Sequence, residues 1–303
     1  MKRKVIKQAN QAYTITLPIE WVRSNQINEK SEINLEIEGK TIMINSKNKI
    51  KGGQITIDAE NFEIKEIAGI LNSLYAKGID EINLKTSKEI SSELIRSLSQ
   101  NIGYALIENK NNTYTIKDIK GSETSELDEI FKRVFQIIIL FFESAIKDVF
   151  GKQEEKTENI NARDLEVNKF CLYLQRAINK KSYPDHIKGR ALFTYSFMLE
   201  KIGDEITRFW RTNTEHKIKK NKSMKEIAQI CLEELGASFD AYFEFNLKKI
   251  NKVFDLRNKI REKTIKLNID SKQTELLRHI IKISEECTDL NPLNIMIKTQ
   301  TQQ

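Results

Sequence analysis

Histidine, cysteine and glycine are scarce in this sequence, with three, three and eleven residues among 303. The histidines, His186, His216 and His279, stand in separate segments, so we expect neither a histidine-based metal centre nor a catalytic triad. Gly52 and Gly53 form the only adjacent glycine pair, and no phosphate-binding or dinucleotide-binding loop motif is present. Without a catalytic constellation of side chains, the sequence predicts that the protein is not an enzyme.

The sequence also lacks paired cysteines and long apolar runs. The cysteines are far apart and form no CxxC motif; they are Cys171, Cys231 and Cys287. Their apolar helical contexts are typical of reduced core thiols in a cytosolic protein. The most apolar stretch, 134–142, contains Gln136 and is about half as long as a membrane-spanning helix. With no signal-peptide pattern at the start, we expect a cytoplasmic protein with no membrane insertion.

Charge is abundant, at 31% of residues, and basic residues are in excess. There are 50 Lys and Arg against 43 Asp and Glu, for a net charge of +7 and a pI of about 9.0. A basic surface that binds an anionic partner is one interpretation. A general bias toward Lys, Asn and Ile is the other, because it raises the pI without any ligand. Composition leaves both open.

Residues 1–47 show the period-two alternation of short β-strands. Pro18 ends the first strand, and Gly39 and Lys40 form the turn between the last two. The expected elements are strands at 13–17, 33–38 and 41–44 and a short helix at 20–23. A β-rich unit of this size is too small to bury a core alone, so we expect a homodimer through residues 1–47.

The pattern changes after residue 47. Strands and helices alternate over 48–120, which predicts a small α/β domain, and a polar linker follows at 121–126. The rest of 121–303 has helical periodicity, with six helices expected at 125–150, 163–182, 189–212, 223–246, 248–267 and 272–291. A basic, polar break at 213–223 separates two sets of three, which predicts an internal duplication with repeats at 125–212 and 223–291.

Basic residues cluster at the N-terminus. Candidate phosphate contacts are Arg3, Lys4, Lys7 and, after the short helix, Arg23. In a β-dimer the positive charges of both copies would lie on one face. Neutralisation of DNA phosphates by such charges provides most of the non-specific affinity for DNA. The alternative is a solvated basic terminus.

The order of residues around these positions resembles the SpoVT/AbrB family. The resemblance lies in Arg3-Lys4-Val5, in the segment 13–22 with its Thr16-Leu17-Pro18 and Trp21, and in the strands over 33–44. It implies a dimer of swapped β-hairpins that presents basic residues to DNA. Ala9-Asn10 and Lys30-Ser31 replace glycines of the family pattern, which makes those two turns less favourable.

Acidic residues one helical turn apart stand beside the apolar stripes of two predicted helices. Glu200 and Asp204 form the first pair, and Glu285 and Asp289 form the second. Carboxylates in this spacing can share hard metal ions. Many such pairs are simply solvated faces, so the spacing alone does not decide between the two interpretations.

The residues around both pairs resemble the metal motifs of PhoU proteins. The segments are 199–206 and 283–290. The resemblance implies that the preceding helix of the first repeat completes a multinuclear site for Fe, Zn, Mg or Mn, with Asp164 and Asn168. In the second repeat Arg257 and Arg261 occupy the corresponding places, so structural ion pairs with Glu285 and Asp289 are an alternative to metal there.

These patterns together predict a multidomain α+β protein. It has an N-terminal swapped-hairpin β domain, a small α/β domain and a C-terminal all-α PhoU-like bundle of two three-helix repeats. Segments 71–82 and 101–104 resemble those between the two outer domains in archaeal PhoU-like proteins. The resemblances imply a DNA-binding transcriptional regulator of phosphate uptake and phosphate homeostasis. The alternatives are a non-DNA-binding adaptor that docks on a phosphate transporter or sensor kinase, and a phosphoester hydrolase, which lacks a nucleophile beyond the acids.

Overall fold

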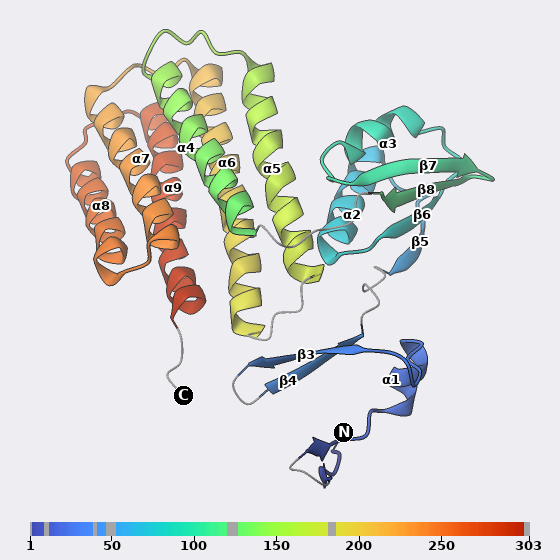
Figure 1. Cartoon of the computed structure of the whole chain (residues 1–303). Coiled ribbons are helices and arrows are strands. Elements are labelled where there is room, and N and C mark those ends of the chain that lie inside the picture. Colours follow the sequence, from blue (N-terminus) through green and yellow to red (C-terminus); the bar gives the residue numbers. More distant parts are fainter. Residues whose placement is uncertain are drawn as a thin grey trace. The chain divides into compact units, whose positions relative to one another are not determined.

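The structure is a computed structural model, and the residues that it describes are 2–8, 12–38, 41–46, 53–119, 127–180 and 186–299. The chain divides into two compact units, Met1–Lys51 and Gly52–Gln302. It is a mixed α+β protein with a small N-terminal β region and a large C-terminal helical region (Figure 1). Among the described residues, no helix is both long enough and apolar enough to cross a membrane. The predicted domain boundaries at 47–48 and 120–121, and the 121–126 linker, lie outside the described residues.

The N-terminal unit consists of two small antiparallel sheets and one short helix. Its elements are β1 (Ile6–Lys7), β2 (Tyr13–Thr14), α1 (Ile19–Ser24), β3 (Ile33–Glu38) and β4 (Thr41–Ser46). β1 pairs with β2, and β3 pairs with β4 in a register that places Glu38 opposite Thr41. This agrees with the strands and short helix expected from the sequence, although the first sheet contains only two residues of each strand. The turns at 9–10 and 39–40 lie outside the described residues.

A four-stranded sheet with two helices follows. The elements are β5 (Gln54–Asp58), α2 (Ile64–Lys77), β6 (Glu81–Lys85), α3 (Ser91–Leu98), β7 (Tyr104–Lys110) and β8 (Thr113–Asp118). The strand order is β5-β6-β8-β7, with β5 and β6 parallel and the other neighbours antiparallel. Asn111 and Asn112, with φ of 51° and 55°, form the tight turn between β7 and β8.

Both helices of this domain cover one face of the sheet. Ile67 and Leu71 of α2 and Leu94 of α3 pack on Ile82 and Ile116 of the strands. On the opposite face polar side chains alternate with these residues; Asn83 accepts a hydrogen bond from Thr115, and Lys117 pairs with Glu81. The alternation therefore leaves one apolar and one polar face, as expected for a sheet covered on one side.

Six helices form the C-terminal bundle in the described ranges 127–180 and 186–299, as predicted. They are α4 (Leu127–Val149), α5 (Thr157–Lys180), α6 (His186–His216), α7 (Lys222–Phe243), α8 (Leu247–Ile265) and α9 (Ser271–Lys298). Helices α4 to α6 pack on one another, as do α7 to α9, and the two sets meet through contacts of α4 with α7 and of α6 with α9. The predicted break at 182–184 lies within residues 181–185, outside the described part.

Helix α6 continues to His216, into the break predicted at 213–223, and α7 ends at Phe243 rather than 246. The largest differences from the predicted helix boundaries are in α5 and α9. Helix α5 begins at Thr157 rather than 163, because the buried Ile160 anchors an additional turn. Helix α9 continues past 291 to Lys298 with Pro292 inside it, because Asn294 and Ile297 are buried and hold the last turns against the bundle. In both cases tertiary burial outweighs the local polar or proline residues that suggested a helix end.

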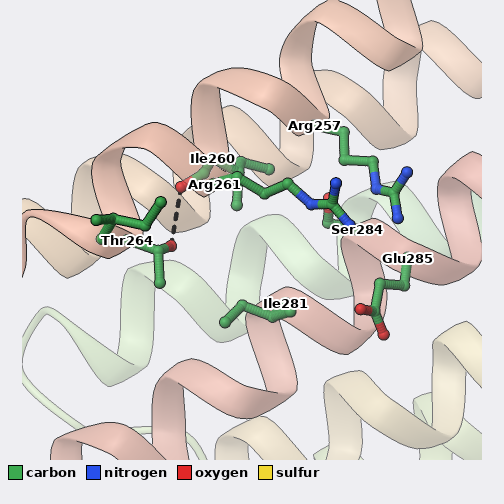
Figure 2. Close-up of a pocket in the computed structure, with 8 residues that line it drawn as sticks. Arg257, Ile260, Arg261, Thr264, Ile281, Ser284 and Glu285 are labelled. Carbon is green, nitrogen blue, oxygen red and sulfur yellow. Dashed lines mark hydrogen bonds between the residues drawn. The ribbon is translucent and has the colours of Figure 1, made fainter.

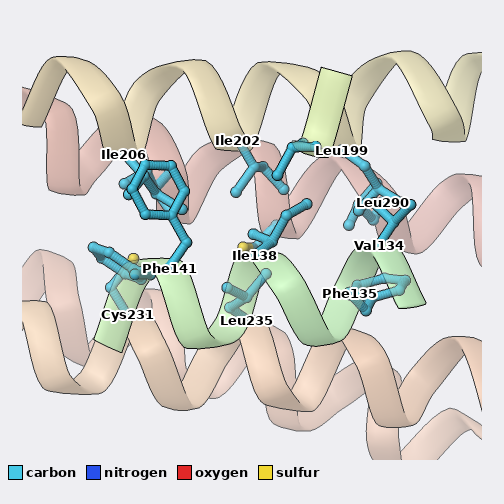
Figure 3. Close-up of a cluster of buried hydrophobic side chains, with 14 of the residues drawn as sticks. Val134, Phe135, Ile138, Phe141, Leu199, Ile202, Ile206, Cys231, Leu235 and Leu290 are labelled. Atoms are coloured by element: carbon cyan, nitrogen blue, oxygen red, sulfur yellow. The ribbon is translucent and has the colours of Figure 1, made fainter. Parts of the chain in front are cut away.

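The bundle core is a continuous apolar cluster in which the helices of both sets interlock. Figure 3 shows Phe135, Ile138 and Phe141 of α4 among side chains of α6, α7 and α9. The three cysteines are buried free thiols in this region, consistent with the core role expected for them.

Arg176 of α5 joins the bundle to the α/β domain. Its side chain is fully buried and donates to the carbonyls of Tyr75 and Ile79 at the end of α2, at 3.0 and 2.7 Å. It also forms ion pairs with Asp80 and Asp118. Asn179 and Lys180 of the same helix also bind this domain, through the Ala76 carbonyl and Asp80, so the end of α5 is fixed against it.

Candidate nucleic-acid interface

The predicted basic residues of the N-terminus lie on and beside the first small sheet. Lys7 belongs to β1 and pairs with Tyr13 of β2, while Arg3 and Lys4 lie in the extended segment that precedes β1. All three side chains are exposed. Within the described residues none of them forms an ion pair, so their charge is available to a polyanion.

Arg23 lies in the last turn of α1, and the local sequence fixes where that helix begins and ends. Pro18 precedes the first turn, as is common at helix starts. At the other end Gln26 takes a positive φ of 53°, and Ile27 N–H donates to the carbonyl of Val22. Arg23 is exposed at this end of the helix, so it too can contact a ligand.

The loop after α1 forms without the glycine expected from the family pattern. Asn28 accepts a hydrogen bond from Lys30 N–H through its side chain (3.0 Å) and from Ser31 N–H through its carbonyl (3.0 Å). Ser31 Oγ in turn accepts from Asn28 N–H. This side-chain turn stabilises the loop in place of a flexible residue. The Lys30-Ser31 departure therefore leaves the approach to β3 intact.

The second hairpin has an apolar face that the unit itself does not cover. Leu35 lies opposite Ile44, and Ile37 lies opposite Ile42. Leu35, Ile37 and Ile42 are 59%, 74% and 60% exposed. Among the side chains of the N-terminal unit whose burial the structure describes, none is fully buried. The unit thus lacks a core of its own, which is the physical condition for association with a second copy.

The acidic residues predicted for the first half come close together at the α5–α6 contact. Burial raises the pKa of Asp164 and of Glu200, and the neighbouring Asp204 raises both further. Thr207 donates a hydrogen bond to Asp164 (2.8 Å), and Arg208 and Lys201 neutralise Asp204.

Asn168, on the same helix as Asp164, has a buried Oδ1 with no hydrogen-bond partner among the described residues. Even so, in this part of the chain no group of three or more His, Cys, Asp or Glu side chains lies in a position to hold a metal ion. The acids do not converge on one point, because Asp164 binds Thr207 and Asp204 binds Arg208 and Lys201. The arrangement as it stands does not fit a metal cluster, and a metal at these residues stays a prediction.

The second half brings together three of the four residues expected there, but not as ion pairs. Arg257, Arg261 and Glu285 line one pocket between α8 and α9, but no ion pair joins either arginine to Glu285 or Asp289. Asp289 is exposed on the outer side of α9. The expected structural ion pairs are therefore absent between these four described residues.

Sequence reasoning missed a buried polar network between α6 and α9. Glu205 pairs with His279 at 2.6 Å, and the other ring nitrogen of His279 lies 3.0 Å from Thr212 Oγ1. Burial opposes ionisation of Glu205, but hydrogen bonds from His279 and Arg208 outweigh it and hold the pKa of Glu205 below its ordinary value. The residues are far apart in sequence, so spacing gave no indication of this contact.

The comparisons with known proteins concern only the N-terminal unit. Residues 6–52 match the model of the family described as antidote–toxin recognition MazE, bacterial antitoxin. No curated protein and no solved structure matches the chain. The matched segment covers all four strands and the helix of the unit just described. The N-terminal unit is thus similar to the MazE and SpoVT/AbrB type of DNA-binding domain, which supports a DNA-binding regulator.

Proposed function

We propose that this protein is a transcriptional regulator that binds DNA as a homodimer through its N-terminal unit. The observation that carries the proposal is the combination, in one unit that matches the MazE family model, of exposed basic side chains and an uncovered apolar hairpin face. Pairing of two hairpin faces would bury the apolar residues and present both sets of Arg3, Lys4, Lys7 and Arg23 to the phosphates of one duplex.

A salt titration with full-length protein and a labelled DNA duplex tests this function. Because the proposed contacts are to phosphates, we expect the logarithm of the affinity to fall linearly with that of the salt concentration. Replacing Arg3 and Lys4 by Ala should weaken binding to all sequences alike and flatten the salt slope by about two per contributing copy.

Arg96→Ala is the matched control, because Arg96 is equally exposed but belongs to the α/β domain. Salt-independent binding, or equal binding by the double variant and the parent, would contradict the phosphate contacts. No DNA binding at any salt concentration would favour the alternative function of an adaptor that docks on a transporter or kinase.

We further propose that the helical region is PhoU-like and connects DNA binding to phosphate homeostasis. Support comes from the two interacting sets of three helices and from the resemblance of 199–206 and 283–290 to PhoU motifs. The proposal predicts that occupancy of DNA sites by this protein differs between phosphate-limited and phosphate-replete cells. Chromatin immunoprecipitation under both conditions measures this, and unchanged occupancy would contradict it.

The metal prediction is restricted to the first half. Asp164, Asn168, Glu200 and Asp204 are oxygen donors, whereas Arg257 and Arg261 in the second half repel a cation. If the purified protein contains metal, Glu200→Ala/Asp204→Ala should remove it and Glu285→Ala/Asp289→Ala should not. Elemental analysis of both variants tests the asymmetry; loss of metal only in the second would reverse the assignment, and a metal-free parent would leave both motifs as structural acids.

A further inference from the structure

A pocket between α8 and α9 has the size of a small-molecule site. Its volume is about 300 Å³, within the range of ligand pockets. Figure 2 shows Arg257 and Arg261 extending from α8 toward α9, where Ser284 and Glu285 face them. The pocket lies in the second helix set and shares no residue with the basic N-terminus.

Neither arginine of this pocket forms an ion pair with a carboxylate among the described residues. Arg257 Nε is buried and makes no hydrogen bond there. Four arginines of the first helix set are different, because they form ion pairs: Arg133 with Glu166, Arg163 with Glu155, Arg176 with Asp118 and Arg208 with Asp204. A buried guanidinium donor with nothing to accept its hydrogen bond requires an explanation, and a bound anion provides one.

The acids near the pocket do not balance this positive charge. Glu234 of α7 interacts electrostatically with Arg257, but burial raises its pKa to about 7, so it is only partly ionised at neutral pH. Its Oε1 already accepts a hydrogen bond from Thr288. Glu285 is then the one acidic side chain in the pocket lining, against two guanidinium groups. The pocket therefore favours an anion over a cation.

The pocket walls are apolar. Ile265 lies one turn from Arg261 at the end of α8 and is 84% exposed, and Ile281 of α9 also lines the pocket. Inorganic phosphate alone would leave these side chains facing water, whereas a purely apolar ligand would leave two guanidinium groups unsatisfied.

We propose that this pocket binds a small amphipathic organic anion. Arg257 and Arg261 hold its carboxylate or phosphate head, and Ile265 and Ile281 contact its apolar body. The site is separate from the proposed DNA contacts, so it can be tested by ligand binding alone.

Isothermal titration calorimetry of the full-length protein with four probes tests the proposal. We expect octanoate and octyl phosphate to bind once per chain, and inorganic phosphate and 1-octanol to bind at least tenfold more weakly. The ratio of the dissociation constants of octanoate and octyl phosphate identifies which head group the site prefers. Equal binding of octanol and octanoate, or no binding of either anionic probe, would overturn the proposal.

Three variants locate the site. Arg257→Gln/Arg261→Gln should lower the affinity for the preferred probe at least tenfold. The control Arg96→Gln, which changes an exposed arginine of α3, should bind the probe as the parent does. Glu285→Gln should tighten binding severalfold, since it removes the remaining negative charge from the lining. A damaged fold cannot produce that gain. If the double variant binds as the parent does, or if Glu285→Gln weakens binding, the anion does not occupy this pocket.

Discussion

Glu234 is a fully buried carboxyl group whose second oxygen has no hydrogen-bond partner among the described residues. Burial is the main cause of its raised pKa, and the hydrogen bond from Thr288 and the charge of Arg257 only partly offset it. The unfolded chain therefore loses this proton at a lower pH than the folded chain does. Between the ordinary Glu range and about pH 7 the folded state binds more protons, so stability falls as the pH rises through this window.

Glu234→Gln is expected to remove this pH dependence. The parent should lose at most about 3 kcal/mol of unfolding free energy between pH 4 and pH 8 from this residue, since one pKa unit corresponds to about 1.4 kcal/mol. The variant, which keeps an oxygen for Thr288 to bond, should be more stable than the parent at pH 8 and nearly equal to it at pH 4. Urea unfolding at both pH values measures the difference; an equal effect at the two values would show that Glu234 is not the titrating group.

At the scale of helices, the contact between α5 and α6 depends on a residue without a side chain. A Cβ on Gly203 would lie 2.9 Å from Val167 Cγ1, whereas at Gly236 in α7 there is no atom within 4 Å. Val167 is buried and β-branched, so it has little freedom to move aside. Gly203 thus permits the close approach that brings Asp164 near Glu200 and Asp204.

Gly203→Ala and Gly236→Ala form a matched pair of tests. Alanine at 236 should stabilise the protein by up to about 1 kcal/mol through helix propensity. At 203 the same gain is opposed by overpacking, so we expect this variant to be less stable than Gly236→Ala by about 1–3 kcal/mol. Thermal or denaturant unfolding measures both, and equal stabilities would mean that α5 and α6 adjust without strain.

How far the sequence predicts these elements depends on the range of the interactions involved. The six helices follow from apolar periodicity, which is local, and their existence was predicted correctly. The extension of α9 through Pro292 was not, because it rests on burial of Ile297 by other helices. Likewise the i,i+4 spacing identified Glu200 and Asp204, but nothing local indicates that Glu205 meets His279 or that Arg257 stays unpaired.

On the scale of the whole molecule, the uncovered hairpin face predicts a dimer. Ile37→Asp should convert the full-length protein to a monomer in analytical ultracentrifugation, because it places a carboxylate in the proposed apolar interface. DNA affinity should fall in parallel, since one copy has half of the basic residues. Thr16→Asp adds the same charge to an exposed polar position and should remain dimeric. A monomeric parent, or a dimeric Ile37→Asp variant, would place the interface elsewhere.

If the proposed dimer is the form that binds DNA, the same uncovered face ties DNA binding to gene dosage. In the proposed dimer, the N-terminal unit buries its apolar face only against a second chain. Each tenfold increase in the association constant of the dimer therefore adds about 1.4 kcal/mol to the stability of the unit. Well below the dissociation constant of the dimer, doubling the expression of the chain roughly quadruples the population of DNA-competent dimers, by mass action. The occupancy of a promoter would then change more steeply than in proportion to the amount of regulator. A modest decrease in synthesis of the regulator would be enough to free the promoter.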